Sequence, residues 1–462
     1  MKRFITITLL AALSCVSLMA QEVVKQDKKA AAKSHLQQHF KPYGFIRNYF
    51  TYDSRESWSG TGDLYNYQPK DQKLNDYGDD LNAQSTFRFL SLTTRLGLNI
   101  TGYQWRSMEV GGKIEADFYA GLSTKGSGTH SLSGVAQFRL RQAYLSLGWD
   151  SLPMMNGKNY ARVDLTIGQT WHPMAADLCD AIALNSGAPF GPFNRSPQVR
   201  MDARLGKYVT LTAAGLWQMQ YLSTGPDGQS AEYIAYSKTP EAYLGLSIHD
   251  KGWLFRAGAD VLSIQPRHLG KDAAGVDIKV NDRITTASPF AYLQYKKGEF
   301  SFKAKTIFAE SGEHMNMYGG YGIKAVNADG SYEYTPIRHS TSWFSLVYGG
   351  KVGAQEDKHP QKLQGILFAG YVKNFGTKEA LATKTDGSLY GFYTPRSNAM
   401  NRMWRLSPTL LWTVGKFQLG CEYEITSVQY GELGSNDLRG LATTNLHWVT
   451  NHRVQVMTKF NF

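Results

Sequence analysis

Alternation of apolar and polar residues, repeated over most of the chain, is the feature that most restricts its fold. From Pro42 onward, segments such as 91–100, 110–122 and 300–308 place apolar side chains at every second position, with polar or charged residues between them. A period of two puts apolar side chains on one surface of a β-sheet and polar ones on the other. The chain is therefore predicted to be all-β.

Alternation also occurs in soluble β-sandwiches, so the choice of a barrel depends on two further features. Charged residues recur in the middle of the expected strands along the whole chain. The connections alternate between tight turns, at 250–252 and 297–298, and long Gly-rich and polar loops, at 266–282, 311–335 and 376–399. Short turns at one end and long loops at the other are typical of outer-membrane barrels.

A transmembrane antiparallel β-barrel of porin type, with about sixteen strands, is therefore predicted for residues 42–462; eighteen strands is the alternative. A barrel of this size encloses a water-filled lumen. After the first residues, no apolar run approaches the roughly 20 residues that a membrane helix needs. The strands are expected near 43–53, 86–101, 107–121, 135–148, 160–171, 198–207, 208–221, 239–249, 252–265, 283–296, 299–310, 338–350, 361–374, 401–414, 416–430 and 447–462.

The N-terminus has the pattern of a cleaved secretory signal peptide over residues 1–20. Lys2 and Arg3 form a basic region, an apolar run follows, and Ala20 is a plausible cleavage point. Residues 21–41 are polar and are expected to form a short periplasmic extension. The combination of export with a predicted barrel indicates the bacterial outer membrane, with its lipid as a partner.

The last strand is expected to close the barrel. Val454, Val456, Phe460 and Phe462 share one face of this strand, whereas Arg453 lies on the other face. An amphipathic strand that ends in Phe resembles the signal read by the barrel assembly machinery, which is therefore an expected partner.

Charge and special residues exclude several classes of function. The formal net charge is +12, which can favour nucleic acid, an acidic membrane face or anionic solutes; export argues against nucleic acid. The two cysteines beyond the signal, Cys179 and Cys421, are expected to be unpaired. We find no local arrangement of a nucleophile with its base, no metal-ligand pattern and no cofactor motif, so no catalytic residue, metal or cofactor is predicted.

The selectivity of a pore comes from its width and from the side chains that line it. On the alternation above, a set of basic residues faces the lumen: Arg47, Arg95, Lys113, Arg139, Arg141, Arg200, Arg204, Arg256, Lys303, Lys305, Arg405, Arg453 and Lys459. We interpret these residues as pore-lining groups that bind small anions.

Two pairs of arginines in this set suggest a basic ladder. Arg139 and Arg141 are two residues apart on one strand, which separates them by about 7 Å on the same wall; Arg200 and Arg204 repeat the arrangement nearby. Guanidinium groups suit carboxylates because both are planar and bind through two hydrogen bonds. The alternative is that these arginines pair with acidic residues and brace the wall: Glu115, Asp117, Asp164 and Asp202.

A long segment bearing Pro and Gly near residues 172–196 is predicted to fold inward and form a constriction loop. It carries Asp177, Asp180 and Arg195. The alternative is an outer loop at a contact between subunits.

Several motifs, taken in order, resemble the succession found in DcaP-like porins, which are outer-membrane channels associated with dicarboxylates. They are the segments at 112–119, 138–144, 167–171, 195–200 and 422–426. The resemblance runs from about residue 43 to the C-terminus, and it implies a sixteen-stranded barrel, a homotrimer and small anionic solutes such as dicarboxylates.

The function predicted from these observations is passive diffusion of small hydrophilic solutes through an anion-preferring porin. Two other classes remain as alternatives. One is a non-conducting barrel that acts in adhesion or ligand binding through its long outer loops. The other, less favoured, is an outer-membrane enzyme.

Overall fold

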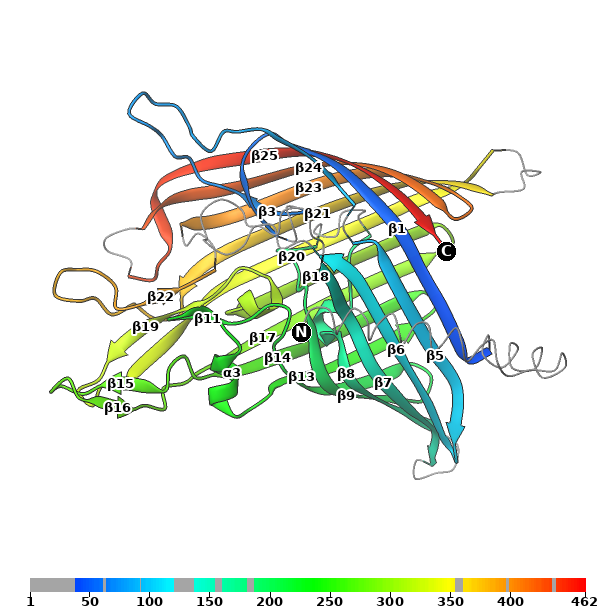
Figure 1. Ribbon diagram of the computed structural model, residues 1–462, viewed down its shortest axis with the longest axis horizontal. Helices are drawn as coiled ribbons and strands as arrows, with labels where there is room; N and C mark the ends of the chain where they lie inside the picture. Colours follow the sequence, from blue (N-terminus) through cyan, green and yellow to red (C-terminus); the bar gives the residue numbers. More distant parts are fainter. Residues whose placement is uncertain are drawn as a thin grey trace, which may run out of the picture.

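A computed structural model describes residues 38–60, 64–91, 93–119, 137–153, 160–180, 187–353, 360–395, 399–433 and 438–462. The strands form one closed antiparallel barrel (Figure 1). Sixteen strands make up the wall, as predicted, when the two collinear segments β4 and β5 are counted as one strand interrupted in its middle. The alternative of eighteen strands is wrong.

The wall strands follow one another around the barrel in chain order. They are β1 (Phe40–Asp53), β4 (Thr86–Leu90) with β5 (Arg95–Trp105), β6 (Met108–Tyr119), β7 (Gln137–Pro153), β8 (Tyr160–Trp171), β9 (Arg195–Leu205), β10 (Val209–Leu216), β13 (Glu241–Asp250), β14 (Trp253–Ile264), β17 (Ile284–Lys297), β18 (Phe300–Glu310), β20 (Tyr332–Val352), β21 (Gln361–Thr377), β23 (Met400–Val414), β24 (Phe417–Leu433) and β25 (Ala442–Asn461).

Smaller elements lie in the connections. They are β2 (Ser57–Gly60), β3 (Tyr65–Pro69), η1 (Pro173–Ala175), β11 (Thr224–Gly225), β12 (Gly228–Gln229), α3 (Glu232–Ser237), β15 (Leu269–Lys271), β16 (Asp277–Lys279), η2 (Glu313–Met315), β19 (Tyr321–Val326) and β22 (Phe392–Tyr393). In the described part of the chain, no helix is long and apolar enough to cross a membrane.

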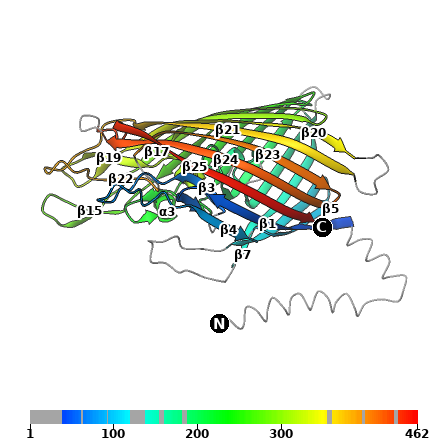
Figure 2. The same cartoon turned by 90° about the horizontal axis from the view of Figure 1, so that it is seen from above.

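The first and last strands close the barrel. β1 and β25 run antiparallel side by side (Figure 2), in a continuous register from Phe45 opposite Asn461 to Asp53 opposite Arg453. On its other edge β1 pairs with both β5 and β4. The predicted strand 86–101 is interrupted between them, where Thr93 has a positive φ of 69°. Closure leaves no open sheet edge, as a strand protein inside a membrane requires.

Tight turns at one end of the barrel are confirmed. The β13–β14 turn includes Lys251 and Gly252, and the β17–β18 turn includes Gly298; all three residues have positive φ. Glycine adopts this backbone conformation without a steric penalty, so the turns can be as short as the sequence predicted. The long connections lie at the opposite end.

The predicted division into an apolar and a polar face also holds. Alternate residues of the wall strands expose large apolar side chains on the outside of the barrel; on the last strand these include Val454, which is 41% exposed, and Phe460, which is 47% exposed. Their neighbours Arg453 and Gln455 are buried on the inside. An apolar outer band over a polar interior is the arrangement that a lipid bilayer stabilises.

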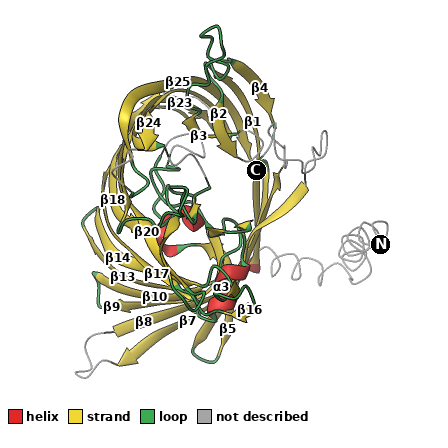
Figure 3. Ribbon diagram, turned by 90° about the vertical axis from the view of Figure 1, so that its left-hand side faces the viewer, coloured by secondary structure: helices red, strands yellow, loops and turns green. Residues whose placement is uncertain are grey.

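The interior is filled in part by connections that fold inward (Figure 3). The β2–β3 hairpin, the described residues of the segment 172–194 (172–180 with η1, and 187–194) and the segment 311–320 with η2 all pack against inner faces of the wall. The prediction that 311–335 is an outer loop is therefore wrong for its first half, and the inward hairpin was not predicted. Both errors have one cause, since the polar composition of a loop does not distinguish bulk water from a polar lumen.

Two further predictions concern the termini and the cysteines. The signal peptide at 1–20 and nearly all of the extension at 21–41 lie outside the described residues. Neither Cys179 nor Cys421 forms a disulfide within the part of the chain that the structure describes.

Gly44 tests the closure. Its backbone exchanges hydrogen bonds with Phe462, and an added Cβ would lie 2.6 Å from the carbonyl oxygen of Arg95 and 2.5 Å from the Phe462 ring. We expect Gly44→Ala to destabilise the folded barrel by about 1–3 kcal/mol, because the overpacked backbone must shift. The measurement is the temperature at which an unboiled sample converts to the gel mobility of a boiled one.

Gly350→Ala is the matched control, because a Cβ at this strand position meets no atom within 4 Å. Its transition temperature should equal that of the wild type. Equal transitions for all three proteins would contradict the role assigned to the β1 end.

Candidate functional site in the barrel lumen

The β2–β3 hairpin is held inside the barrel by side chains of three wall strands. Its residues Leu64 to Gln68 are all buried. Arg453 of β25 donates to the carbonyl of Leu64 at 2.9 Å, and Tyr430 of β24 donates to the carbonyl of Pro69 at 2.5 Å. The hairpin is thus bound through its backbone, so sequence patterns of the loop itself carry little sign of it.

The segment 172–194 crosses to the wall opposite its own strand. Asp177 forms ion pairs with Arg256 of β14 and, at 3.7 Å, with Lys305 of β18, while Asp180 lies 2.7 Å from Lys303. These three cations are therefore partners of the loop acids. The two acidic residues predicted in the loop are brought together with three of the predicted lumen cations.

The far end of this segment is fixed by packing. Phe190 is fully buried and lies against the ring of Phe368 and the backbone of Gly370, and its carbonyl accepts a hydrogen bond from Thr341 at 2.7 Å. A Cβ at position 370 would lie 2.6 Å from the Phe190 ring, so glycine at this strand position allows the ring to enter.

The third inward segment joins the other two. The backbone N–H of Phe193 donates to Met315, and the Asn194 side chain donates to the carbonyl of His314. Asn316 donates to the Tyr67 hydroxyl at 3.2 Å. The three segments therefore form one connected body inside the lumen, which we call the lumen plug: the described residues 57–60, 64–69, 172–180, 187–194 and 311–320.

Arg405 of β23 is the side chain that contacts the most of the plug. Its guanidinium donates to the carbonyls of Asn66 (2.5 Å) and Tyr67 (3.2 Å) in the hairpin and of Ala188 (3.1 Å) in the second segment. The side chain is buried, with Glu424 at 3.5 Å. Only arginine offers five donors in a fixed planar fork, which explains how one residue satisfies carbonyls from two segments.

The arginines predicted to form a basic ladder instead follow the alternative, in which they pair with acidic residues of the wall. Arg139 binds Asp117 through two hydrogen bonds of 2.9 and 3.0 Å, and Arg141 binds both Asp117 and Glu115. Arg200 pairs with Asp202 at 3.0 Å and Arg204 with Asp164 at 3.0 Å. All four arginines are thus paired with the acidic residues that the bracing interpretation named.

A wider excess of positive charge nevertheless follows one side of the lumen. We call it the basic wall, and its residues lie on β1, β5, β6, β7, β9 and β25. It comprises two carboxylates, Glu115 and Asp117, and seven cations: Arg47, Arg95, Lys113, Arg139, Arg141, Arg195 and Lys459. Four of these cations, Arg95, Lys113, Arg139 and Arg141, form ion pairs with the two carboxylates.

Aromatic rings connect these cations into one patch. Arg47, Arg95 and Lys459 lie 4.8, 5.0 and 4.5 Å from the ring centroid of Phe45. Trp171 lies between Arg141 and Arg195, at 5.9 and 5.0 Å. Cations over aromatic faces are stabilised without being neutralised, so the patch keeps its charge.

Arg195 differs from the other predicted residues of the constriction loop. It is the first residue of β9 instead of a loop residue. Its side chain is 2% exposed, and within the described part of the chain no carboxylate pairs with it; Nη1 has no hydrogen-bond partner. A buried, unpaired guanidinium is costly, so its position calls for an external partner.

A cavity of about 500 Å³ lies between the basic wall and the plug. Arg139 and Arg195 line one side of it, and Tyr67, Tyr221 and Glu313 line the other parts. Tyr67 and Tyr221 share a hydrogen bond of 3.2 Å between their hydroxyls. Burial and the neighbouring tyrosines raise the pKa of Tyr221 well above its ordinary value, so its hydroxyl remains a donor.

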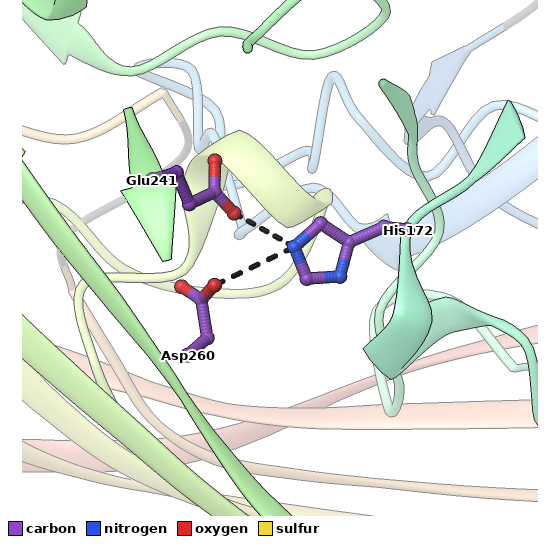
Figure 4. A group of neighbouring side chains, drawn as sticks. All are labelled: His172, Glu241 and Asp260. Carbon is purple, nitrogen blue, oxygen red and sulfur yellow. Dashed lines mark hydrogen bonds and ion pairs between the residues drawn. The ribbon is translucent and has the colours of Figure 1, made fainter. Parts of the chain in front are cut away.

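His172, Glu241 and Asp260 form a buried group beside the plug (Figure 4). The His172 Nε2 lies 2.7 Å from Glu241 and 3.5 Å from Asp260, and residues of these types can bind a divalent metal. The Nδ1 of His172 accepts the backbone N–H of Met174 at 3.1 Å, which leaves the ring proton on Nε2. A metal bound at Nε2 would shift that proton to Nδ1, where it would point at the Met174 N–H. This geometry therefore favours a group of side chains held together by hydrogen bonds.

His314 supplies positive charge to the same group. Its Nε2 lies 3.5 Å from Glu241 and 3.6 Å from Asp260. Burial opposes the charged ring, but the two carboxylates outweigh this effect and raise the pKa of His314 well above its ordinary value. The sequence search missed this four-residue group, because its members are spread over about 140 positions and no spacing connects them.

The barrel has the fold of a solved outer-membrane channel. The outer-membrane channel DcaP of Acinetobacter baumannii matches with a TM-score of 0.59 and 19% identity over 92% of this chain and 97% of that chain. An anion-selective porin from Comamonas acidovorans matches with a TM-score of 0.46 and 10% identity over 92% of this chain and 99% of that one. The trimer form of OmpT from Vibrio cholerae matches with a TM-score of 0.46 and 11% identity over 92% of this chain and 99% of that chain.

No protein-family model and no curated protein matches the sequence. The predicted resemblance to DcaP-like porins is confirmed at the level of the fold.

Arg405→Met tests the plug. We expect this change to destabilise the folded protein by about 3–5 kcal/mol, because it leaves three carbonyls without their donor and Glu424 buried without its cation. Single-channel recordings should show a larger and noisier conductance as the plug loosens. Arg402→Met, on the same strand, is the control, since Arg402 donates to Gln429 and lies over the ring of Trp448, both on wall strands. If other contacts hold the plug, the two variants will have the same stability and the same conductance.

Proposed function

We propose that this protein is an outer-membrane porin through which small hydrophilic solutes diffuse, with a preference for organic anions. The observation that carries the proposal is the basic wall, where, among the described residues, seven cations outnumber two carboxylates and only four of the cations are in ion pairs with them. A charged wall raises the local concentration of counter-ions in a narrow pore and sets the sign of the ions that pass.

The lumen plug serves as the constriction in this proposal. Both acidic residues of its second segment form ion pairs with cations of the opposite wall. Asp177 pairs with Arg256 and Lys305, and Asp180 pairs with Lys303. The acids of the plug are thereby neutralised where they are bound. The basic wall on the other side of the plug is then the dominant charge along the remaining path.

Partners of the porin follow from its class. The exposed apolar band contacts outer-membrane lipid, and export through the signal peptide precedes insertion by the assembly machinery through the last strand. A homotrimer is supported by the trimer form of OmpT among the similar structures. The resemblance to DcaP-like porins adds dicarboxylates to the anions that the pore would pass, and the Comamonas acidovorans porin is itself anion-selective.

Arg95→Gln tests the anion preference. Arg95 lies 3.5 Å from Glu115, which keeps Arg141 and Tyr43 as partners after the change. One charge about 7 Å from a passing ion is worth about 0.6 kcal/mol in water and acts with opposite sign on anions and cations. The ratio of anion to cation permeability should therefore fall roughly sevenfold, and further where the lumen is less polar than water. Reversal potentials across a salt gradient measure this ratio.

Arg204→Gln is the matched control. It removes the same charge from a side chain that is 57% exposed and paired with Asp164, so the reversal potential should stay near that of the wild type. A wild-type pore without anion preference would contradict the proposal, as would an equal shift in both variants.

A further inference from the structure

The cavity beside the basic wall is lined by a basic and an acidic side chain that each carry a buried atom without a hydrogen-bond partner in the described part of the chain. Arg195 lies on one side and Glu313 on the other. Buried polar groups in folded proteins are almost always hydrogen-bonded, so each exception calls for an explanation such as a ligand or an ordered water. Three such exceptions, on Arg195, Glu313 and Gln220, line this one cavity.

The cationic side is Arg195. Its guanidinium is held between the rings of Trp171 and Phe193, with the ring centroids 5.0 and 5.9 Å away. These contacts orient the fork without using its donors. A carboxylate that entered the cavity would satisfy the unpartnered Nη1 and offset the buried charge.

The anionic side is Glu313, in the three-residue turn η2. Its side chain is 2% exposed, and its Oε2 accepts the backbone N–H of Gly312 at 2.9 Å. Oε1 has no partner, and no lysine, arginine or histidine of the described chain forms an ion pair with this carboxylate. Glu313 therefore presents a carboxyl group with a vacant acceptor.

An uncharged acceptor adds to the anionic side. Gln220 also lines the cavity, and its Oε1 is buried without a hydrogen-bond partner. An ammonium group carries three donors and no acceptor, so it complements two vacant acceptors. A second carboxylate would meet Glu313 with the same sign of charge and would gain nothing from Gln220.

We propose that this cavity is a subsite for small zwitterions, that is, solutes with one carboxylate for Arg195 and one ammonium group for Glu313 and Gln220. The assignment rests on the proposed porin function and specifies which solutes the pore retains after entry. Arg195 and Glu313 do not pair with each other, so both charges remain available to one solute that reaches between them. The cavity volume of about 500 Å³ falls within the roughly 300–1,000 Å³ of known ligand sites.

The experiment compares three probes that differ only at one end: 4-aminobutanoate, glutarate and butanoate. The purified full-length protein is recorded in planar bilayers, and the residence time of each probe is taken from interruptions of the current. We expect 4-aminobutanoate to stay at least about tenfold longer than butanoate, the factor that one hydrogen bond to a charged group contributes. Glutarate should stay no longer than butanoate.

Glu313→Gln removes the negative charge and keeps the shape of the side chain. It should shorten the residence of 4-aminobutanoate to that of butanoate and lengthen that of glutarate. Glu333→Gln is the matched control, because Glu333 is 52% exposed at the rim beside Lys324; it should behave as the wild type. The heat-dependent gel mobility of each variant shows that it is folded.

Different failures identify different errors. Normal currents with equal residence of 4-aminobutanoate and butanoate, or longer residence of glutarate, would overturn the zwitterion subsite and leave the porin intact. An absence of current through the folded protein would overturn the porin proposal. In that case the rise in unfolding temperature with each probe in detergent still ranks them, and no rise with 4-aminobutanoate would reject the subsite as well.

Discussion

The pairing of β1 with β25 is the interaction on which the rest of the structure depends. Without it, both strands would present unpaired N–H and C=O groups to lipid, which costs several kcal/mol for each group. Closure turns the sheet into a wall with an apolar outside and a polar inside. Inside the barrel, one apolar cluster joins Met174, Phe190 and Met315 of the plug to wall residues such as Phe368, and polar contacts hold the rest of the plug.

Arginine side chains supply most of those contacts. Arg405 and Arg453 donate to backbone carbonyls of the β2–β3 hairpin, and Arg405 also donates to the segment 172–194. Acidic side chains do the reverse where the plug meets the opposite wall, through Asp177 and Asp180. These ion pairs neutralise charges that would otherwise attract solutes. In the proposed pore, selectivity then depends on the cations in excess on the basic wall, which include Arg195.

The strands were predictable, because each depends on a local repeat. A period of two assigns every residue to a face, and this assignment does not require knowledge of the partner strand. Of the site, the sequence therefore indicated which cations face the lumen, such as Arg95 and Arg256, and which loop bears acids. It did not indicate that Arg139 and Arg141 bind Glu115 and Asp117, although both interpretations were available, because pairing depends on the register between strands.

By itself, the sequence determined the barrel, the tight turns and the two faces, because these follow from local backbone geometry and from the demand that every strand be paired. It left a choice between sixteen and eighteen strands. Only the tertiary structure decided that three connections meet inside the lumen, that Arg405 binds two of them, and that Arg195 and Glu313 reach one cavity without partners. The physical reason is distance along the chain. Arg195 and Glu313 are about 120 positions apart, and they reach one cavity because the closed strands bring their loops together. No local sequence pattern predicts such an arrangement.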